Sequence, residues 1–421
     1  MSPALVCMRR YTLSSASREF ADARSNGHEF LRNTSMHTYS ATDPGAGEIS
    51  YRDTRRYGWM IATFFPLVPL LGIGLILYSG LQWTMWIPLL LIYTLVPLLD
   101  YWLGEDERNP PEQIVPQLEA DRYYRYLTFA AVPMHFITLI VAAWYVGSHE
   151  IALPGFLALV FTTGVVNGMA INTGHELGHK NTVLEKNLAK IVLAVSAYPH
   201  FNIEHNAGHH AQVATPEDSA SSRFGENIYR FAMREIPGGA RRGWRLEKQR
   251  LARLDKKLWS FSNIILQSLA ISIVLYGLLT AYFGTMALLF LLLQAPVAWF
   301  QLTGANYVEH YGLLRQKLPD GRYEACEPRH SWNANHVASN ILLFHLERHS
   351  DHHYHATRRY QSLRHFDDAP QLPSGYVGMF LLAYVPFLWR KVVDPRTLAL
   401  VDGDLNKLNV DPKLLARQPA G

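Results

Sequence analysis

Three long stretches without lysine or arginine constrain the fold of this chain more than any other feature. They cover residues 57–107, 126–179 and 258–314. Each is long enough for two membrane spans of about 20 residues. Helices buried in a large soluble core are a weaker explanation, because apolar stretches of this length are typical of bilayer spans. We therefore predict an all-α integral membrane protein with six transmembrane helices.

The positions of the spans also predict an orientation. We expect them at about 59–80, 83–103, 126–147, 151–172, 260–281 and 285–304. The linkers within each pair are only a few residues long, so all lysines and arginines fall on the other side. The positive-inside rule assigns that side, with both termini, to the cytoplasm. We expect a multi-pass protein of a bacterial inner (cytoplasmic) membrane.

The remaining segments are polar. Residues 1–50 lack the apolar run of a secretory signal and are expected to form a flexible arm. We expect residues 51–410 to form the membrane domain, with cytoplasmic insertions at 173–258 and 305–410 forming a helical cap, and 411–421 to be a tail. The apolar stretch at 376–389 is short for a span and is expected on or under the membrane face. No nucleic-acid partner is expected.

Nine of the 19 histidines fall in four short clusters, HELGH, EHNAGHH, NYVEHYGL and ERHSDHH. They are His175, His179, His205, His209, His210, His310, His349, His352 and His353. Residues three or four apart share a helix face. His175 with His179, His205 with His209, and His349 with His352 or His353 are therefore expected to converge. Adjacent histidines diverge by about 100°, which suits ligands shared between two ions and predicts a dimetal site.

The ligand set indicates the metal and its electron supply. Imidazole suits zinc, copper and iron, but nine neutral nitrogens exceed one tetrahedral zinc site. Two ions with four or five nitrogens each leave room for a small oxidant, so a pair of non-haem irons fits best. The only cysteines, Cys7 and Cys326, form no CxxC pair. Electrons must then come from another protein.

Polar side chains beside the histidines are expected to orient the imidazole rings, because a metal-bound imidazole usually donates its second N–H to such a group. The candidates are Glu176, Glu204, Glu309, Asp351, Asn172, Asn206 and Asn306. Solvent contact or helix capping is the alternative for any one of them.

Residues on the same helix faces are candidates to line an apolar substrate channel: Ile92, Val96, Asn167, Ile171 and Thr303. Asp100 marks the inward face of the second span, unless it is a simple interfacial carboxylate.

The motifs NTGHELGHK, EHNAGHH, NYVEHYGLLRQK and LERHSDHH, with LLDYWLGEDERNPP and HSWNANH beside them, resemble those of the integral-membrane di-iron alkane 1-monooxygenases. The resemblance covers roughly residues 50 to 410. It implies six spans and two irons held by the nine histidines. It also implies terminal hydroxylation of medium-chain linear alkanes to primary alcohols with O2. Electrons would come from rubredoxin and its NADH-dependent reductase.

Other functions stay open. An acyl-lipid desaturase or fatty-acid hydroxylase shares histidine boxes and topology, but HNAGHH places three residues before its histidine pair. HELGH also satisfies the zinc-protease pattern HExxH with Glu176 as general base, which leaves the other clusters unexplained. A metal transporter should place ligands across the membrane rather than on one side.

A basic run is the candidate surface for an acidic electron carrier. It comprises Arg241, Arg242, Arg245, Lys248, Arg250, Arg253, Lys256 and Lys257. Positive-inside charge or contact with lipid headgroups is the alternative.

Overall fold

The computed structural model describes residues 37–45 and 47–416 and is almost wholly helical. In this part of the chain six segments are long and apolar enough to cross a membrane: Trp59–Ser79, Gln82–Leu103, Arg122–Ser148, Leu153–Gly178, Ile264–Phe283 and Thr285–His310. The predicted six spans are thus confirmed. The fourth and sixth reach Gly178 and His310, well past their expected ends, because these helices continue into the histidine clusters.

Prolines divide the first span. It consists of α2 (Trp59–Phe64), the 3₁₀ turn η2 (Phe65–Leu67) and α3 (Val68–Ser79), with Pro66 and Pro69 at the junctions. Each proline removes a backbone donor from the helix. The other spans are η3 (Gln82–Trp86) with α4 (Ile87–Leu103), α6 (Arg122–Ser148), α7 (Leu153–Gly178), α12 (Ile264–Phe283) and α13 (Thr285–His310).

Helices α7 and α13 approach each other closely through two glycines. A Cβ atom on Gly164 would lie 2.5 Å from Val297 Cβ, and one on Gly168 would collide with Gln301 Cβ. Glycines four residues apart let two helix backbones meet inside a membrane. Since both helices end in histidines, this contact sets the distance between two parts of the site.

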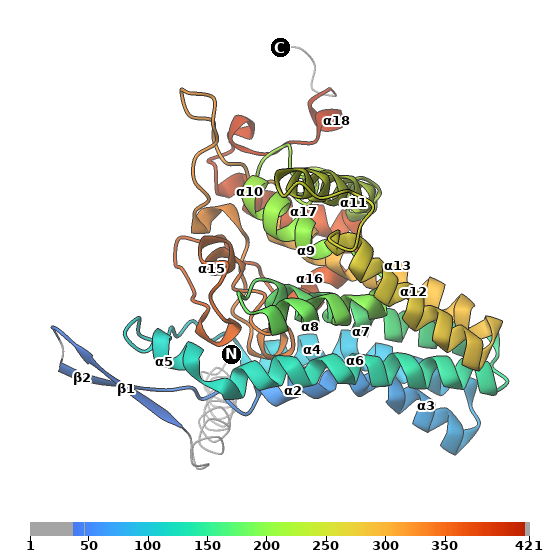
Figure 1. Cartoon of the computed structure of the whole chain (residues 1–421). Coiled ribbons are helices and arrows are strands. Elements are labelled where there is room, and N and C mark those ends of the chain that lie inside the picture. The colour runs from blue at the N-terminus through green and yellow to red at the C-terminus, as the bar shows by residue number, and fades with distance from the viewer. Residues whose placement is uncertain (1–36, 46, 417–421) are drawn as a thin grey trace, which may run out of the picture.

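Most of the remaining helices form a cap at one end of the bundle (Figure 1). They are α5 (Val115–Ala120), α9 (Phe201–Glu204), η5 (His205–His209), α10 (His210–Gln212), α11 (Ile228–Arg253), η6 (Pro328–His330), α14 (Val337–Leu342), α15 (His349–Tyr354), η7 (Tyr360–Ser362), α16 (Tyr376–Ala383), α17 (Pro386–Ala399), η8 (Leu405–Lys407) and α18 (Pro412–Leu415). Helix α8 (Val183–Leu193) and η4 (Ala194–Ser196) instead run along the spans, where Ala189, Val192 and Val195 join the same core cluster (Figure 1). Asp100 is buried and accepts from the Ser339 backbone N–H at 2.9 Å, which docks α14 on α4.

A bend separates α16 from α17. Their axes meet at 119°, so the apolar segment around residues 376–389 does not form one straight span. Val385 and Phe387 remain exposed next to the bend, and Phe387 is 73% exposed. We call this bent pair the elbow.

A two-stranded antiparallel hairpin precedes the first span. It pairs β1 (Thr38–Asp43) with β2 (Gly47–Arg52), and Thr38 lies opposite Arg52. Tyr39 is buried, and its hydroxyl donates to Asp121 at 2.7 Å. The hairpin is thereby attached to the helical domain. Most of the expected arm (residues 1–36) and the end of the expected tail (417–421) lie outside the described residues.

Candidate metal centre

The nine histidines form two groups of converging ring nitrogens, with the ligand atoms of each group within 4.8 Å of one another. The first group is His175, His179, His205, His210 and His352. The second group is His209, His310, His349 and His353. The numbers match the expectation of four or five nitrogens at each of two ions. We call these sets the five-histidine and the four-histidine group.

Each group is assembled from segments that lie far apart in the sequence. His175 lies in the last turn of α7 and His310 ends α13, so two spans deliver ligands directly. Helix α15 adds the ligands of the fourth cluster, and His352 Nε2 lies 2.9 Å from His175 Nε2. In the four-histidine group, His353 Nε2 and His349 Nε2 are 2.9 Å apart.

A π-helical turn, η5, determines how the second cluster is shared. His205–His209 form this turn, in which each N–H bonds five rather than four residues back. His205 therefore faces His210, with 3.1 Å between their Nε2 atoms. The predicted pairing of His205 with His209 is wrong for this reason.

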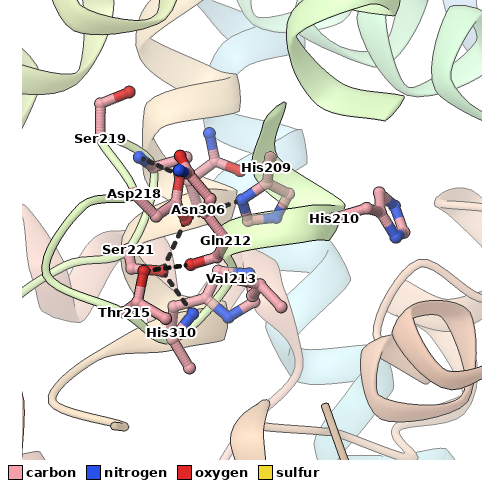
Figure 2. Close-up of polar contacts among 12 residues, drawn as sticks. His209, His210, Gln212, Val213, Thr215, Asp218, Ser219, Ser221, Asn306 and His310 are labelled. Carbon is pink, nitrogen blue, oxygen red and sulfur yellow. Dashed lines mark hydrogen bonds and ion pairs between the residues drawn. The ribbon is translucent and has the colours of Figure 1, made fainter. Parts of the chain in front are cut away.

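The prediction that adjacent histidines serve different ions agrees with the two groups. His209 and His210 lie in different groups, and so do His352 and His353. Figure 2 shows His209 turned toward Asp218, with His210 on the other side.

The donor atoms fit a metal ion. Burial, followed by the neighbouring imidazoles, lowers the pKa of the His205, His349 and His352 rings well below the usual value. Neutral rings offer lone pairs, which is the form that binds metal. Among the described residues, His179 Nε2 and His209 Nε2 are buried without a hydrogen-bond partner. Buried polar atoms normally have one, and a cation bound between the rings would supply it.

Asp218, which the sequence analysis missed, is the carboxylate behind a candidate ligand. Its Oδ2 lies 2.9 Å from His209 Nδ1, and the Ser221 hydroxyl donates to the same carboxylate at 2.6 Å (Figure 2). Burial favours the neutral acid, but His209 and Arg242 outweigh it and hold the pKa of Asp218 well below its usual range. An ionised Asp218 keeps the proton on Nδ1 and leaves Nε2 free for metal.

Glu309 is the one expected carboxylate that reaches a histidine nitrogen of either group in the described chain. Its Oε2 lies 3.3 Å from His349 Nε2. That nitrogen also faces His310 and His353. Glu309 thus lies beside a candidate ligand atom of the four-histidine group, rather than behind an imidazole as expected.

The other three expected carboxylates support the surrounding chain instead. Glu176 Oε1 lies 3.1 Å from Lys180 Nζ, Glu204 accepts from Arg242 Nε at 2.7 Å, and Asp351 Oδ1 lies 2.7 Å from His355 Nδ1. In the described chain these carboxylates make no hydrogen bond to the nine imidazoles. Lys180 and His355 lie one helical turn after their carboxylates, whereas Arg242 comes from a distant segment that local spacing does not identify.

The three asparagines likewise form their hydrogen bonds with groups other than the histidine rings. Asn172 donates to the Leu343 carbonyl at 2.7 Å and Asn206 to the Gly178 carbonyl at 3.0 Å. These bonds tie the cap to α7. Asn306 donates to Glu235 Oε1 at 3.3 Å.

An apolar cavity reaches both histidine groups. His175, His205 and His349 line it, and so do the predicted channel residues Ile92 and Ile171. Glu309, Asn172 and Asn306 add the polar atoms nearest the histidines. The cavity lies between the spans and the cap, so it connects an apolar region to the candidate metal centre.

The other predicted channel residues do not line the cavity. Val96 packs in the cluster beside Ile92. Asn167 donates to Gln294 Oε1 at 2.9 Å inside the bundle. It lies eight residues before His175, so the two side chains point about 80° apart around the helix. Thr303 donates to Glu235 Oε2 at 2.7 Å, so α11 covers it.

Comparison with known proteins finds a matching family model and similar proteins that cover most of the chain. Residues 151–383 match the family model described as fatty acid desaturase. Alkane 1-monooxygenase 1 of Alcanivorax borkumensis is 53% identical over 86% of this chain and 90% of its own length. The alkane 1-monooxygenase of Pseudomonas putida is 53% identical over 87% of this chain and 91% of its own. The alkane 1-monooxygenase of Ectopseudomonas oleovorans is 53% identical over 86% of this chain and 91% of its own length.

Proposed function

This chain belongs to the alkane 1-monooxygenase family, within the wider fatty acid desaturase family, and from that premise we propose how it works. It is an oxidoreductase that hydroxylates the terminal carbon of linear alkanes with O2. The observation that supports this function best is the apolar cavity ending at two histidine groups. We expect medium-chain alkanes as substrates and primary alcohols as products.

Two non-haem irons are the proposed cofactors, held by the nine histidines. Their support is the all-nitrogen donor set without thiolate, divided five and four, with the Glu309 carboxylate beside the second group. When bound, such a pair activates O2 toward an unactivated C–H bond. Asp218 holds His209 in the tautomer that binds metal.

The cavity binds and orients the substrate. An alkane has no charge or hydrogen-bonding group, so only the removal of apolar surface from water holds it. Ile92, Ile171 and Phe201 supply such surface beside the histidines. An alkane lying in this cavity with one end at the histidine groups would present its terminal methyl group to bound metals, and the apolar lining would keep water from the reacting carbon.

Metal analysis and product analysis test the proposal together. We expect about two irons per chain in the purified protein, and octan-1-ol from octane when a mixture of alkanes and fatty acids is supplied with a reducing system. About one zinc per chain without iron would contradict the dimetal assignment. Hydroxylated or desaturated fatty acids as the main products would contradict the substrate class.

Histidine variants locate the metals. Alanine at His175 or His310 should lower the metal content and abolish alcohol formation, because each removes a ligand from one group. His149→Ala is the matched control, since His149 follows α6 at the end of the spans away from the two groups. Full metal content and activity in His310→Ala would remove that residue from the site.

We propose the bacterial inner membrane as the location, with the cap and both termini in the cytoplasm. Support comes from the loops at 80–81, 149–152 and 284, which contain no lysine or arginine. Cysteines introduced at Gly80 and at Lys248, in a chain without its two native cysteines, should react with an impermeant reagent from opposite faces. Labelling of both sites from one face would refute this topology.

Rubredoxin, reduced by an NADH-dependent reductase, is the proposed electron donor. The basic run supports it only in part, because Arg242 is buried against Glu204 and Arg250 pairs with Glu247. Arg253, Lys256 and Lys257 lie beside the exposed Trp259 and Phe261, a combination suited to lipid headgroups. The exposed Arg241, Arg245 and Lys248 on α11 are the proposed carrier surface.

Charge reversal tests this surface. Arg241→Glu with Arg245→Glu should slow reduction by rubredoxin, and added salt should reduce the difference from the wild-type rate. Lys186→Glu, at an exposed position on α8, is the control. Equal rates for wild type and variant at every salt concentration would contradict electrostatic steering.

A further inference from the structure

The cavity has a polar cluster in its wall, at a distance from the histidines. Gln301 and Tyr93 line the cavity, from α13 and α4 respectively. Gln301 lies nine residues before His310, which places it about 13 Å back along α13. The cavity therefore extends along the helix axis from the candidate metals to this cluster.

Three side chains from separate elements form the cluster. The Tyr93 hydroxyl donates to Gln301 Oε1 at 3.0 Å, and the Tyr384 hydroxyl donates to the same oxygen at 3.2 Å. The two hydroxyl oxygens are 3.4 Å apart. Among the described residues, Gln301 Nε2 has no hydrogen-bond partner. The amide oxygen is thus fully used, while two N–H donors remain available.

The cluster lies between the cavity and the elbow, whose apolar side chains are exposed. Tyr384 occupies the bend between α16 and α17, beside the exposed Val385 and Phe387. Phe380, one turn earlier, lines the cavity. A molecule leaving the cavity between α4, α13 and the elbow would pass these three polar side chains.

We propose that Tyr93, Gln301 and Tyr384 form a binding subsite for the hydroxyl group of a primary alcohol. This inference rests on the proposed function, whose product is such an alcohol. The alkane substrate has no group that could pair with the cluster, whereas the alcohol would carry an unpaired hydroxyl through an apolar wall, which is unfavourable. The cluster supplies a partner at the point where the product leaves for the lipid.

The subsite predicts a preference that an apolar slot would lack. Octan-1-ol should bind more tightly than octane, because Gln301 Nε2 can donate to its oxygen and the tyrosine hydroxyls can pair with it. One such hydrogen bond corresponds to about a 2- to 10-fold change in affinity. The alcohol should also inhibit turnover as a product.

The test compares two ligands on the iron-loaded enzyme in lipid nanodiscs. Dissociation constants of octan-1-ol and octane are measured by calorimetry for wild type, Gln301→Met and Tyr384→Phe. Both variants keep the approximate side-chain volume and remove a polar group. We expect the affinity for octan-1-ol to fall about 2- to 10-fold while that for octane stays constant. Phe380→Leu, an apolar change in the same wall, should affect both ligands equally.

Two results would overturn the inference: an equal loss for alcohol and alkane in Gln301→Met and Tyr384→Phe, or no loss for either ligand. The first would mean that the cluster only shapes the wall. Failure of the proposed function is distinguishable, because an iron-loaded enzyme that forms no octan-1-ol from octane can still be tested for alcohol binding.

Discussion

Glu235 should make the stability of this protein fall as the pH rises, and replacing it with glutamine should remove that effect. Glu235 lies on α11 and is only 3% exposed. The Thr303 hydroxyl and Asn306 Nδ2 donate to its carboxyl group. In the described chain it forms no ion pair. Burial, with the nearby carboxylates of Glu204 and Asp218, raises its pKa from 4.5 to about 7.

The direction of the effect follows from proton binding. In the folded protein Glu235 keeps its proton up to about pH 7, whereas in the unfolded chain it loses the proton near pH 4.5. Between these values the unfolded state is favoured as the pH rises. A tenfold step in proton affinity corresponds to about 1.4 kcal/mol. The free energy of unfolding should therefore fall by about 3 kcal/mol between pH 4.5 and pH 8 through this group alone.

The assay is denaturant unfolding in a mild detergent, followed by tryptophan fluorescence at half-unit steps from pH 5 to pH 8. Glu235→Gln should gain stability relative to wild type as the pH rises, because the glutamine stays neutral. Glu107→Gln, at an exposed carboxylate, is the matched control. A difference between Glu235→Gln and wild type that does not change with pH would refute the reasoning.

Three further perturbations test the site and the packing around it. Asp218→Asn should weaken metal binding by the four-histidine group about 10- to 100-fold, seen as faster loss of one iron to a chelator; equal retention of both irons would contradict this. Gly164→Ala should cost about 1–3 kcal/mol in unfolding free energy, because its Cβ would lie 2.5 Å from Val297 Cβ, whereas Gly277→Ala meets no atom within 4 Å and should not destabilise the protein. Ile92→Phe should shorten the longest alkane hydroxylated from a mixture, because Ile92 lines the cavity; an unchanged product profile would exclude Ile92 from the substrate path.

The spans and the ligand inventory could be predicted because both depend on local sequence. A helix that crosses a bilayer must be apolar along its whole length, so blocks without lysine or arginine identify it directly. The histidine clusters were equally visible, since ligands three to five residues apart need only one helical segment to meet. The separation of His352 from His353 follows from helix geometry alone.

The supporting residues could not be predicted in this way. Asp218 contacts His209 from nine residues further along the chain, and Arg242 reaches Asp218 from α11. No periodicity links such positions. The channel prediction failed at Asn167 and Thr303 because a shared helix face gives a direction but not the neighbour that occupies it. The close approach at Gly164 and Gly168 likewise becomes evident only once α13 is placed beside α7.

The π-helical turn at His205–His209 has a consequence for how such sites change during evolution. It acts as a single-residue insertion that shifts the helical phase, so the second cluster gives two ligands to the five-histidine group and one to the other. The fourth cluster has α-helical spacing and gives one ligand to the five-histidine group and two ligands to the four-histidine group. The allocation of ligands is thus encoded in segment length as well as residue identity. A one-residue deletion there would keep all nine histidines and still reassign the coordination spheres.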